Sequence, residues 1–326
     1  MTEITLIEAI NQALRYEMTD DKDVILLGED IGVNGGVFRA TQGLFEKFGR
    51  ERVLDTPLAE SMIAGLSIGM ATQGLKPVAE FQFMGFSYPA LDQIINHAAR
   101  IRNRTRGRLH CPLVFRMPYG AGIHAPEHHS ESTETLFAHI PGLRVVVPSS
   151  PARAYGLLLA AIRNPDPVIF LEPTRLYRLH RQNVKDSGEA LALDQSFLLR
   201  EGKDITLISW GAMLHETLMA ADSLLKKGLS ADVIDVATLK PLDSALLLNS
   251  VEKTGRCIII HEAARFCGVG AEIAAQLSEK AFLSLKAPIQ RVTGYDVTVP
   301  YAQLEKQYLP SLVKIINVIN QTLEFI

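Results

Sequence analysis

The chain has little of what marks disulfide-rich, metal-binding or membrane proteins. Only three of its 326 residues are cysteines. They are Cys111, Cys257 and Cys267. An odd number of cysteines without C-x-x-C spacing argues against a disulfide framework or a zinc site, and it favours a reducing compartment. No apolar run reaches the roughly 18 residues of a membrane span, and no basic stretch followed by an apolar stretch opens the chain. We therefore expect a cytoplasmic protein.

Several functional fingerprints are missing as well. The net charge is −3 and no long run of one sign occurs, so neither nucleic acid nor an anionic membrane is an expected partner. No G-x-x-x-x-G-K-[ST] phosphate loop and no G-x-S-x-G serine motif is present. The glycines of residues 268–273, G-V-G-A-E-I, lack the third small residue of a dinucleotide site and are more simply explained by close packing of a helix.

The pattern that is present is an alternation of strands and helices. Hydrophobic residues make up 47% of the chain, which is enough for a sizeable core, and its length favours two domains. A capping box at Thr5–Glu8 opens a helix, and Ser150 with Pro151 opens another. Short apolar runs predict strands at residues 24–27, 77–83, 112–115, 144–147 and 168–171. This alternation predicts an α/β fold with a parallel sheet in a first domain, residues 1–180.

Residues 181–200 are charged and weakly periodic, so we interpret them as a linker. A second alternating block follows, and we expect a smaller α/β domain over residues 201–326. Its predicted strands lie at residues 205–209, 232–236, 257–260 and 289–293, and its predicted helices at 213–227, 270–277 and 312–323.

Three segments are candidates for chemistry. Glu60 precedes an apolar helix, where a carboxylate either complements the helix dipole or, if poorly hydrated, shares a proton with a ligand nitrogen. The run of residues 80–89 contains four aromatics, which indicate either one face of a core strand or a platform for a flat heterocycle. Its aromatics are Phe81, Phe83, Phe86 and Tyr88.

The third segment is a loop rich in histidine. It contains His124, His128, His129 and His139 together with serine and glutamate, and its spacing matches no standard zinc signature. Such loops often carry function. A helix end near Ala160–Asp166 would also present free carbonyls that suit a hard cation.

Taken together, these segments resemble the β subunits of pyruvate and branched-chain 2-oxo acid dehydrogenases. The similarity extends over the whole chain, and it is specific because many short matches occur in order. In the first domain they are Leu27-Gly28-Glu29-Asp30, Gly35-Gly36-Val37-Phe38-Arg39, the D-T-P-L-A-E stretch that ends at Glu60, Asp92-Gln93-Ile94, His129-Ser130-Glu131-Ser132, Pro141-Gly142-Leu143 and residues 167–172. In the second they are Gly211-Ala212-Met213 and residues 239–243 and 251–256.

The resemblance implies a thiamine-diphosphate-binding pyrimidine domain followed by a C-terminal domain of the transketolase type. By family pattern, Glu60 is the carboxyl that bonds to the aminopyrimidine ring, Phe86 the aromatic against that ring, and His129 the histidine of acyl transfer. A structural potassium ion would have as its ligands the carbonyls of Leu113, Ala161, Ile162 and Asn164, with Asp166 nearby. The stretch Asn164-Pro165-Asp166 departs from the commoner Asp-Asn form of that site.

The family binds the diphosphate through magnesium on a G-D-G…N-N motif, and no G-D-G occurs here. The resemblance therefore implies that an α subunit holds magnesium and the diphosphate, in an α₂β₂ tetramer. The implied activity is decarboxylation of pyruvate and reductive acetylation of the lipoyl group of an acyltransferase core, in the bacterial cytoplasm. Alternatives are a branched-chain 2-oxo acid dehydrogenase or acetoin dehydrogenase β subunit and, from another class, a non-catalytic scaffold subunit.

Overall fold

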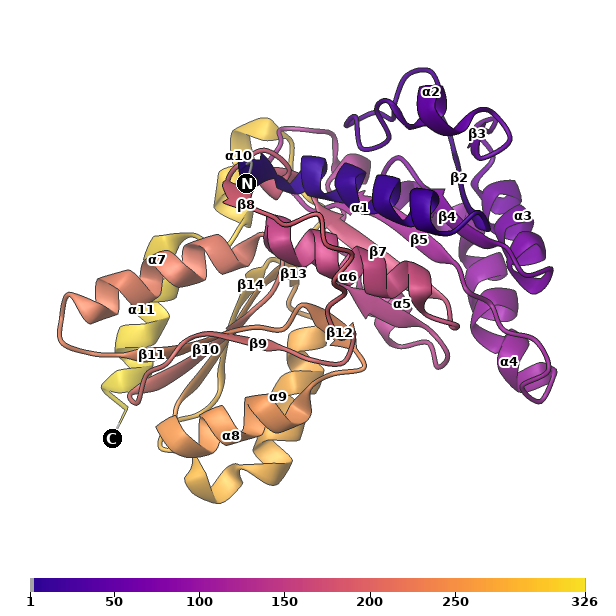
Figure 1. Cartoon of the computed structure of the whole chain (residues 1–326). Coiled ribbons are helices and arrows are strands. Elements are labelled where there is room, and N and C mark those ends of the chain that lie inside the picture. Colours follow the sequence, from indigo (N-terminus) through magenta and orange to yellow (C-terminus); the bar gives the residue numbers. More distant parts are fainter. Residues whose placement is uncertain (1–2, 326) are drawn as a thin grey trace. The chain divides into compact units, whose positions relative to one another are not determined.

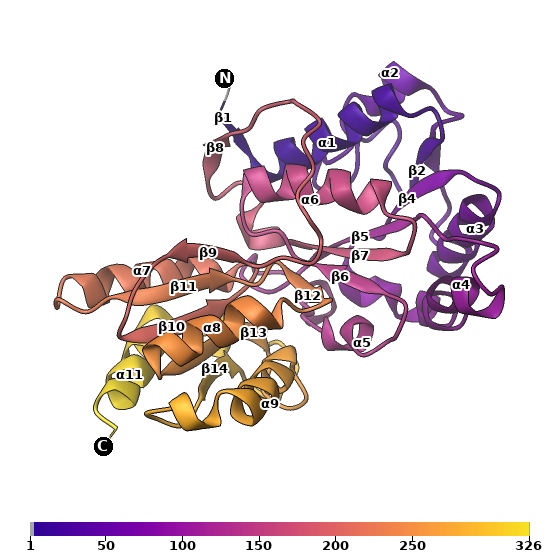
Figure 2. The same cartoon turned by 60° about the horizontal axis from the view of Figure 1, so that its bottom comes forward.

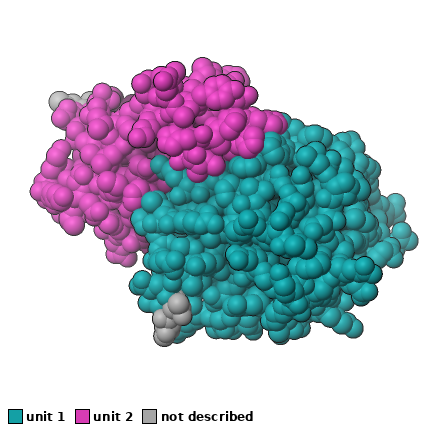
Figure 3. Space-filling model, turned by 90° about the horizontal axis from the view of Figure 1, so that it is seen from above, with its two compact units in different colours: residues 1–119, 136–193 teal, residues 120–135, 194–326 magenta. Residues whose placement is uncertain are grey.

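The computed structural model describes residues 3–325, which divide into two compact units. The first contains the described chain up to Tyr119 together with Leu136–Leu193, and the second contains Gly120–Thr135 and the chain from Asp194 onward (Figure 3). The segment 120–135 thus belongs with the C-terminal part of the chain, although sequence alone placed it within the first domain.

A parallel sheet forms the core of the first unit. Its strands run in the order β6-β7-β5-β4-β2-β3, and every pairing between them is parallel. They are β2 (Val24–Gly28), β3 (Val53–Asp55), β4 (Lys76–Glu80), β5 (Val114–Tyr119), β6 (Arg144–Val146) and β7 (Val168–Pro173). Both β5 and β7 are buried along their whole length, as expected for a parallel sheet covered on both faces. The predicted α/β class is confirmed.

The helices of this unit begin where the sequence predicted. The capping box of α1 (Leu6–Asp20) is complete, because Thr5 accepts a hydrogen bond from the Glu8 N–H and Glu8 accepts one from the Thr5 N–H. Ser150 caps α6 (Pro151–Arg163). These two helices lie side by side, and α3 (Glu60–Thr72) and α4 (Ile101–Arg104) lie apart from them (Figures 1 and 2).

Shorter elements complete the unit. They are α2 (Leu44–Phe48), the 3-10 helices η1 (Met84–Ala90), η3 (Ala98–Arg100) and η5 (Thr174–Leu176), the π-helical turn η2 (Gln93–His97), and α5 (Thr135–Ala138), which begins at the unit boundary. The predicted strand 77–83 is too long, because β4 ends at Glu80 and the chain then turns into η1. Phe86 and Tyr88 therefore lie on a helical turn and not on the face of a strand.

The residues interpreted as a linker contain regular structure. β8 (Arg181–Asn183) pairs antiparallel with β1 (Glu3–Thr5), and β9 (Phe197–Arg200) pairs antiparallel with a strand of the second unit. Neither strand has a clear alternation of apolar and polar residues, because both are short and β8 is exposed throughout.

The second unit is a smaller α/β domain, as predicted. Its sheet has the order β14-β13-β10-β11-β9, in which β9 alone is antiparallel to its neighbour. The strands are β9, β10 (Ile205–Ser209), β11 (Ala231–Asp235), β13 (Cys257–Ala264) and β14 (Gln290–Gly294), and the unit also contains β12 (Thr238–Lys240) and η4 (Glu127–His129).

Helices cover both faces of this second sheet. α7 (Met213–Leu225) and α11 (Leu312–Leu323) pack together on one face, and α8 (Ser244–Thr254) and α9 (Val269–Lys280) on the other (Figures 1 and 2). A short helix, α10 (Ala302–Tyr308), and the 3-10 turn η6 (Phe282–Ser284) complete the unit. Between residues 3 and 325, none of the helices is both long enough and apolar enough to span a membrane.

Candidate active site

The carboxyl ends of β2, β3 and β4 define one edge of the first sheet. Gly28, the last residue of β2, is in register with both Asp55, the end of β3, and Glu80, the end of β4. In parallel α/β sheets, ligands bind beyond this edge, where the loops from neighbouring strands meet. Glu29, Glu60 and Phe86 follow these three strands in turn, so the topology gathers them at the same edge of the sheet.

Glu60 is the first residue of α3 and is half-buried. The helix N-terminus favours a carboxylate at this position, and the Ser61 hydroxyl ties it to η1 by donating to the Pro89 carbonyl at 2.6 Å. Burial, and then the charges of Asp30 and Glu60, raise the pKa of Glu29. Two carboxyls, Glu29 and Glu60, therefore lie within electrostatic reach of each other, which is an arrangement that holds a proton readily.

Phe86 belongs to a small aromatic group on the same unit. Its ring meets Phe83 edge-on at a centroid distance of 5.4 Å, and Phe83 meets Phe38 at 5.5 Å. Phe83 is buried whereas Phe86 is only half-buried, so part of the Phe86 side chain is exposed. The aromatic side chains thus fix Phe86 from one side without enclosing it.

A buried charge network lies at the same end of the sheet and was not indicated by the sequence. Arg116 on β5 donates from Nε and from one terminal nitrogen to Glu172, at 2.7 and 2.9 Å, and from the other terminal nitrogen to Glu80 at 2.7 Å. The Tyr177 hydroxyl donates to Glu172 at 2.6 Å. Burial alone lowers the pKa of Arg116, but the two carboxylates outweigh it and raise that pKa. Arg116 therefore stays charged, whereas burial raises the pKa of Glu80, and the network fixes the strand ends from which the loops emerge.

The histidine loop lies in the second unit and is anchored by a buried carboxylate. Glu305 of α10 accepts the Gly122 N–H at 2.7 Å and the His124 N–H at 3.2 Å, and its carboxylate is 3.0 Å from His124 Nδ1. His129 ends the turn η4, is half-buried, and donates its N–H to the Pro126 carbonyl at 2.9 Å. His139, in contrast, is exposed on the first unit. The four histidines of the sequence pattern are therefore divided between the two units.

Beside this loop, the second unit buries a second group of titratable side chains. Glu134 accepts a hydrogen bond from Trp210 Nε1 at 3.2 Å, and the Trp210 ring stacks on His261 with centroids 5.0 Å apart. Burial, with the charge of Glu262 adding to it, raises the pKa of Glu134 to about 8. Burial lowers the pKa of His261 to about 3. Both side chains are therefore neutral near pH 7.

The glycines that imitate a dinucleotide fingerprint pack against His261. A Cβ atom on Gly270 would lie 2.6 Å from His261 Nε2, and one on Gly268 would lie 2.7 Å from the Ala264 carbonyl. Only glycine fits at such distances. Close packing of α9 on its strand accounts for both positions.

The residues predicted to surround a potassium ion lie at the C-terminal end of α6 and the start of β5. The Ala161 carbonyl accepts the Asn164 N–H at 3.2 Å, and the Leu113 carbonyl accepts the Val168 N–H at 3.0 Å. Each carbonyl has a second lone pair, so both remain able to bind a cation. Asp166 forms an ion pair with Arg102 at 2.7 Å, which occupies one of its oxygens.

Comparisons with known proteins match both units of the chain. The family model described as transketolase, pyrimidine binding domain, matches residues 2–180, and that of the transketolase C-terminal domain matches residues 195–315. A solved structure titled "Split gene transketolase, inactive beta4 tetramer" is similar with a TM-score of 0.81 at 24% identity, and covers 99% of each chain. At that identity the likeness describes the fold alone.

Curated relatives are more similar. The pyruvate dehydrogenase E1 component subunit beta of Bacillus subtilis (strain 168) is 47% identical over 325 residues, and that of Staphylococcus epidermidis (strain ATCC 12228 / FDA PCI 1200) is 48% identical. The Staphylococcus aureus (strain N315) protein of the same name is 46% identical. In each comparison the alignment covers 100% of both chains.

The fold and these matches define the class, a chain built from the pyrimidine-binding and C-terminal domains of transketolase. Within that class, the chain belongs to the family of pyruvate dehydrogenase E1 component β subunits. The predicted fold and the predicted family are both confirmed. Family membership implies thiamine diphosphate as the cofactor, and a carboxyl at a helix N-terminus and a half-buried phenyl ring at the same edge of the sheet suit the aminopyrimidine part of that molecule.

Two carboxyls with a raised pKa, Glu29 and Glu134, were not identified from the sequence as candidates for function. Glu29 belongs to the matching segment Leu27-Gly28-Glu29-Asp30, which assigns it no role of its own, although a carboxylate directly after a buried strand is a signal of function at the edge of a parallel sheet. Glu134 gave no signal, because its burial depends on Trp210, which lies far along the chain.

Proposed function

We propose that this chain is the β subunit of a pyruvate dehydrogenase that decarboxylates pyruvate and acetylates a lipoyl group, and that it provides the pyrimidine side of the cofactor site. The observation that carries the proposal is the position of Glu60. It begins α3 at the carboxyl edge of the parallel sheet and lies within electrostatic reach of Glu29. Whole-length similarity to the Bacillus and Staphylococcus subunits supports the choice of pyruvate.

Thiamine diphosphate, when bound, supplies a carbon nucleophile that stabilises the carbanion left by decarboxylation. Glu60 would share a proton with a ring nitrogen of the aminopyrimidine. Phe86, packed edge-on against Phe83, would orient the flat ring. Glu29 would keep a second carboxyl close to Glu60 and so favour a shared proton.

His129 would serve proton transfer during acylation of the lipoyl group. The turn that carries it is fixed by its own hydrogen bonds, and the preceding part of the loop is fixed by Glu305. An imidazole side chain can both give and take a proton, which suits this role.

The other components follow from what this chain lacks. No G-D-G motif occurs in the sequence, so we propose that an α subunit holds the diphosphate and its magnesium ion in an α₂β₂ tetramer. We also propose that the second domain binds the acyltransferase core. A potassium ion would lie against the carbonyls of Leu113, Ala161, Ile162 and Asn164, with the carboxylate of Asp166, one of whose oxygens pairs with Arg102, nearby.

The Glu60→Gln variant, assembled with the α subunit, tests the central assignment. Loss of the proton-holding carboxyl should lower kcat for pyruvate decarboxylation by about 100-fold or more, while size-exclusion chromatography shows unchanged assembly. The matched control is Glu51→Gln, which removes an exposed carboxylate from the same unit. Activity within about twofold of the wild type would contradict the role of Glu60.

A substrate comparison tests the choice of 2-oxo acid. The assembled enzyme should have a higher kcat/KM for pyruvate than for 3-methyl-2-oxobutanoate. A preference for the branched substrate would assign the chain to a branched-chain enzyme and leave the assignment of Glu60 intact. No decarboxylation with any 2-oxo acid, in an assembly that contains thiamine diphosphate and magnesium, would indicate a scaffold subunit.

The role of His129 can be separated from decarboxylation by changing the acceptor. His129→Gln should reduce the rate with a lipoyl domain by about 100-fold and affect the rate with a small artificial oxidant much less. His139→Gln is the matched control, since His139 is exposed. Equal losses with both acceptors would place His129 in the decarboxylation step instead.

A further inference from the structure

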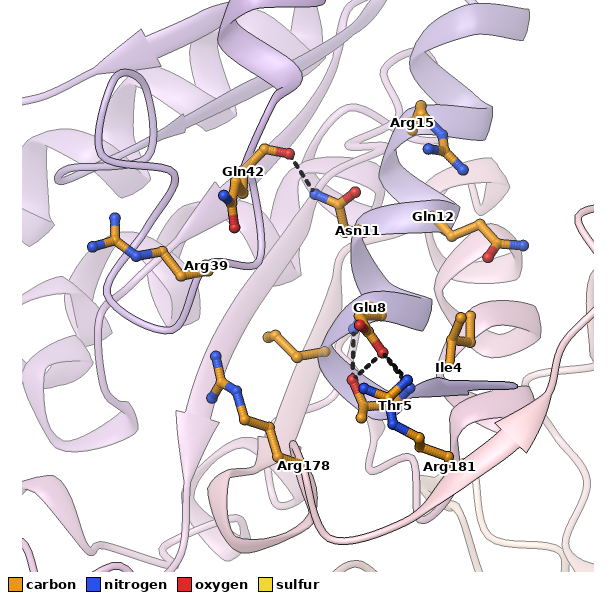
Figure 4. Close-up of a pocket in the computed structure, with 11 residues that line it drawn as sticks. Ile4, Thr5, Glu8, Asn11, Gln12, Arg15, Arg39, Gln42, Arg178 and Arg181 are labelled. Carbon is orange, nitrogen blue, oxygen red and sulfur yellow. Dashed lines mark hydrogen bonds and ion pairs between the residues drawn. The ribbon is translucent and has the colours of Figure 1, made fainter. Parts of the chain in front are cut away.

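The first unit contains a basic pocket whose lining includes none of the residues proposed for thiamine chemistry. Its volume is about 520 Å³, within the range typical of small-molecule sites. Four arginines line it against a single carboxylate, although the chain as a whole has a net charge of −3 (Figure 4). The charged lining residues are Arg15, Arg39, Arg178, Arg181 and Glu8.

Segments far apart in the sequence bring these side chains together. α1 contributes Arg15 and Glu8, and the pairing of β1 with β8 places Arg181 opposite Thr5. The loop that carries Arg39 is tied to α1, because Asn11 Nδ2 donates to the Ala40 carbonyl at 2.9 Å. The fold therefore builds the pocket from the start of the chain, the loop after β2 and the segment after β7.

Backbone carbonyls orient two of the guanidinium groups without neutralising them. Arg178 donates to the Phe38 carbonyl at 2.9 Å, and Arg39 donates to the Asn34 carbonyl. Within the described part of the chain, neither arginine forms an ion pair with a carboxylate. Arg39 also has a φ of 70°, which is uncommon for a residue with a side chain, and this conformation is held by hydrogen bonds of the loop.

The other two arginines have only weak acidic partners. Arg15 is 3.5 Å from Asp186, with both side chains nearly half exposed, and Arg181 is 3.4 Å from Glu8. Exposed pairs of this kind contribute little. Glu8 is itself occupied by the capping box, since it accepts the N–H and the hydroxyl of Thr5 at 2.7 Å each. The pocket thus keeps an excess of positive charge.

We propose that this pocket binds a small molecule that carries two or more phosphate groups, such as inorganic pyrophosphate or a nucleoside diphosphate. Guanidinium groups match phosphate oxygens in pairs, and four of them around one hollow exceed what a single phosphate needs. Gln12 and Gln42 add neutral hydrogen-bonding groups, and Ile4 and Ile7 add an apolar surface for the remainder of the ligand. The concave shape favours such a molecule over an acidic protein segment.

Calorimetric titration of the full chain with pyrophosphate, and separately with ADP, tests the proposal. One molecule should bind per chain, and affinity should fall as ionic strength rises. The double variant Arg39→Gln/Arg178→Gln should weaken binding by about tenfold for each guanidinium removed. The control Arg50→Gln/Arg108→Gln removes the same charge from exposed positions elsewhere and should leave binding unchanged.

Arg39 and Arg178 also hold the loop in place, so weaker binding in the double variant does not by itself separate loss of charge from a change in the loop. A substitution that should strengthen binding therefore provides a second test. Gln12→Arg adds a fifth guanidinium to the lining and should tighten binding of both probes several-fold. The proposal is overturned by no binding to the wild type at 1 mM probe, by equal weakening in the control variant, or by unchanged affinity in both pocket variants. Tighter binding of a hexaglutamate peptide than of either phosphate would assign the pocket to an acidic protein segment instead.

Discussion

The dependence of stability on pH tests whether Glu134, the buried carboxyl of the second unit, is neutral in the folded protein. Its pKa rises from 4.5 to about 8 because burial disfavours the charged form. A carboxyl with a raised pKa binds more protons in the folded state than in the unfolded state. Its contribution to stability is therefore fully present below about pH 4.5, falls as the pH rises, and is lost above about pH 8.

The size of the effect follows from the same two values. Each pKa unit corresponds to about 1.4 kcal/mol, so the whole interval represents at most about 5 kcal/mol of the free energy of unfolding. Glu134→Gln retains an oxygen that accepts the Trp210 hydrogen bond but has no proton to lose. Relative to the wild type, the variant should gain about 1.4 kcal/mol in unfolding free energy per pH unit between pH 5 and 8.

Urea denaturation of both proteins at pH 5.5, 6.5 and 7.5 measures this difference. Other titrating groups contribute equally to the two proteins and cancel in the comparison. Glu252→Gln, at an exposed position, is the control and should show no trend with pH. A constant difference between Glu134→Gln and the wild type across this range would refute the assignment of a neutral buried carboxyl.

Four further substitutions test the packing described above. Arg116→Met leaves two buried carboxylates without their cation and should cost about 3–5 kcal/mol in urea unfolding. Thr5→Ala removes the cap of α1 and should cost about 1 kcal/mol in the same assay. Gly142→Ala should lower the melting temperature, because the residue has a φ of 93° and its Cβ would clash with the Ala99 carbonyl. Glu305→Gln should speed hydrogen exchange of the amides in residues 120–135, and unchanged exchange would show that the loop needs no such anchor.

Much of the fold was predictable because its signals are local. Strand β10 and helix α11 have the predicted bounds, since a buried parallel strand is a continuous apolar run and an amphipathic helix repeats with a regular period. The helix starts at the Thr5 capping box and at Ser150–Pro151 were predictable because these signals are also local. The short edge strands β8 and β9 were not, because their pairing depends on partners distant in sequence.

The candidate site was less predictable than the fold. Family resemblance indicated Glu60, Phe86 and His129, but the sequence could not show that Glu29 lies near Glu60, because that proximity arises from the register of β2 with β3. The cluster of Glu134, Trp210 and His261 likewise exists only after folding. A role that depends on burial in the folded protein cannot be predicted from the order of residues along the sequence.

The assignment of residues 120–135 to the second unit has a consequence for anyone who dissects this protein. The chain passes between the two units three times, at Tyr119, at Thr135 and at Leu193. Truncation at one point in the chain therefore releases neither unit intact. A fragment that ends within residues 181–200 keeps the histidine loop but lacks Glu305, which anchors the loop, and Trp210, which donates a hydrogen bond to Glu134. The two units should therefore be expressed, mutated and exchanged together, as one intact chain.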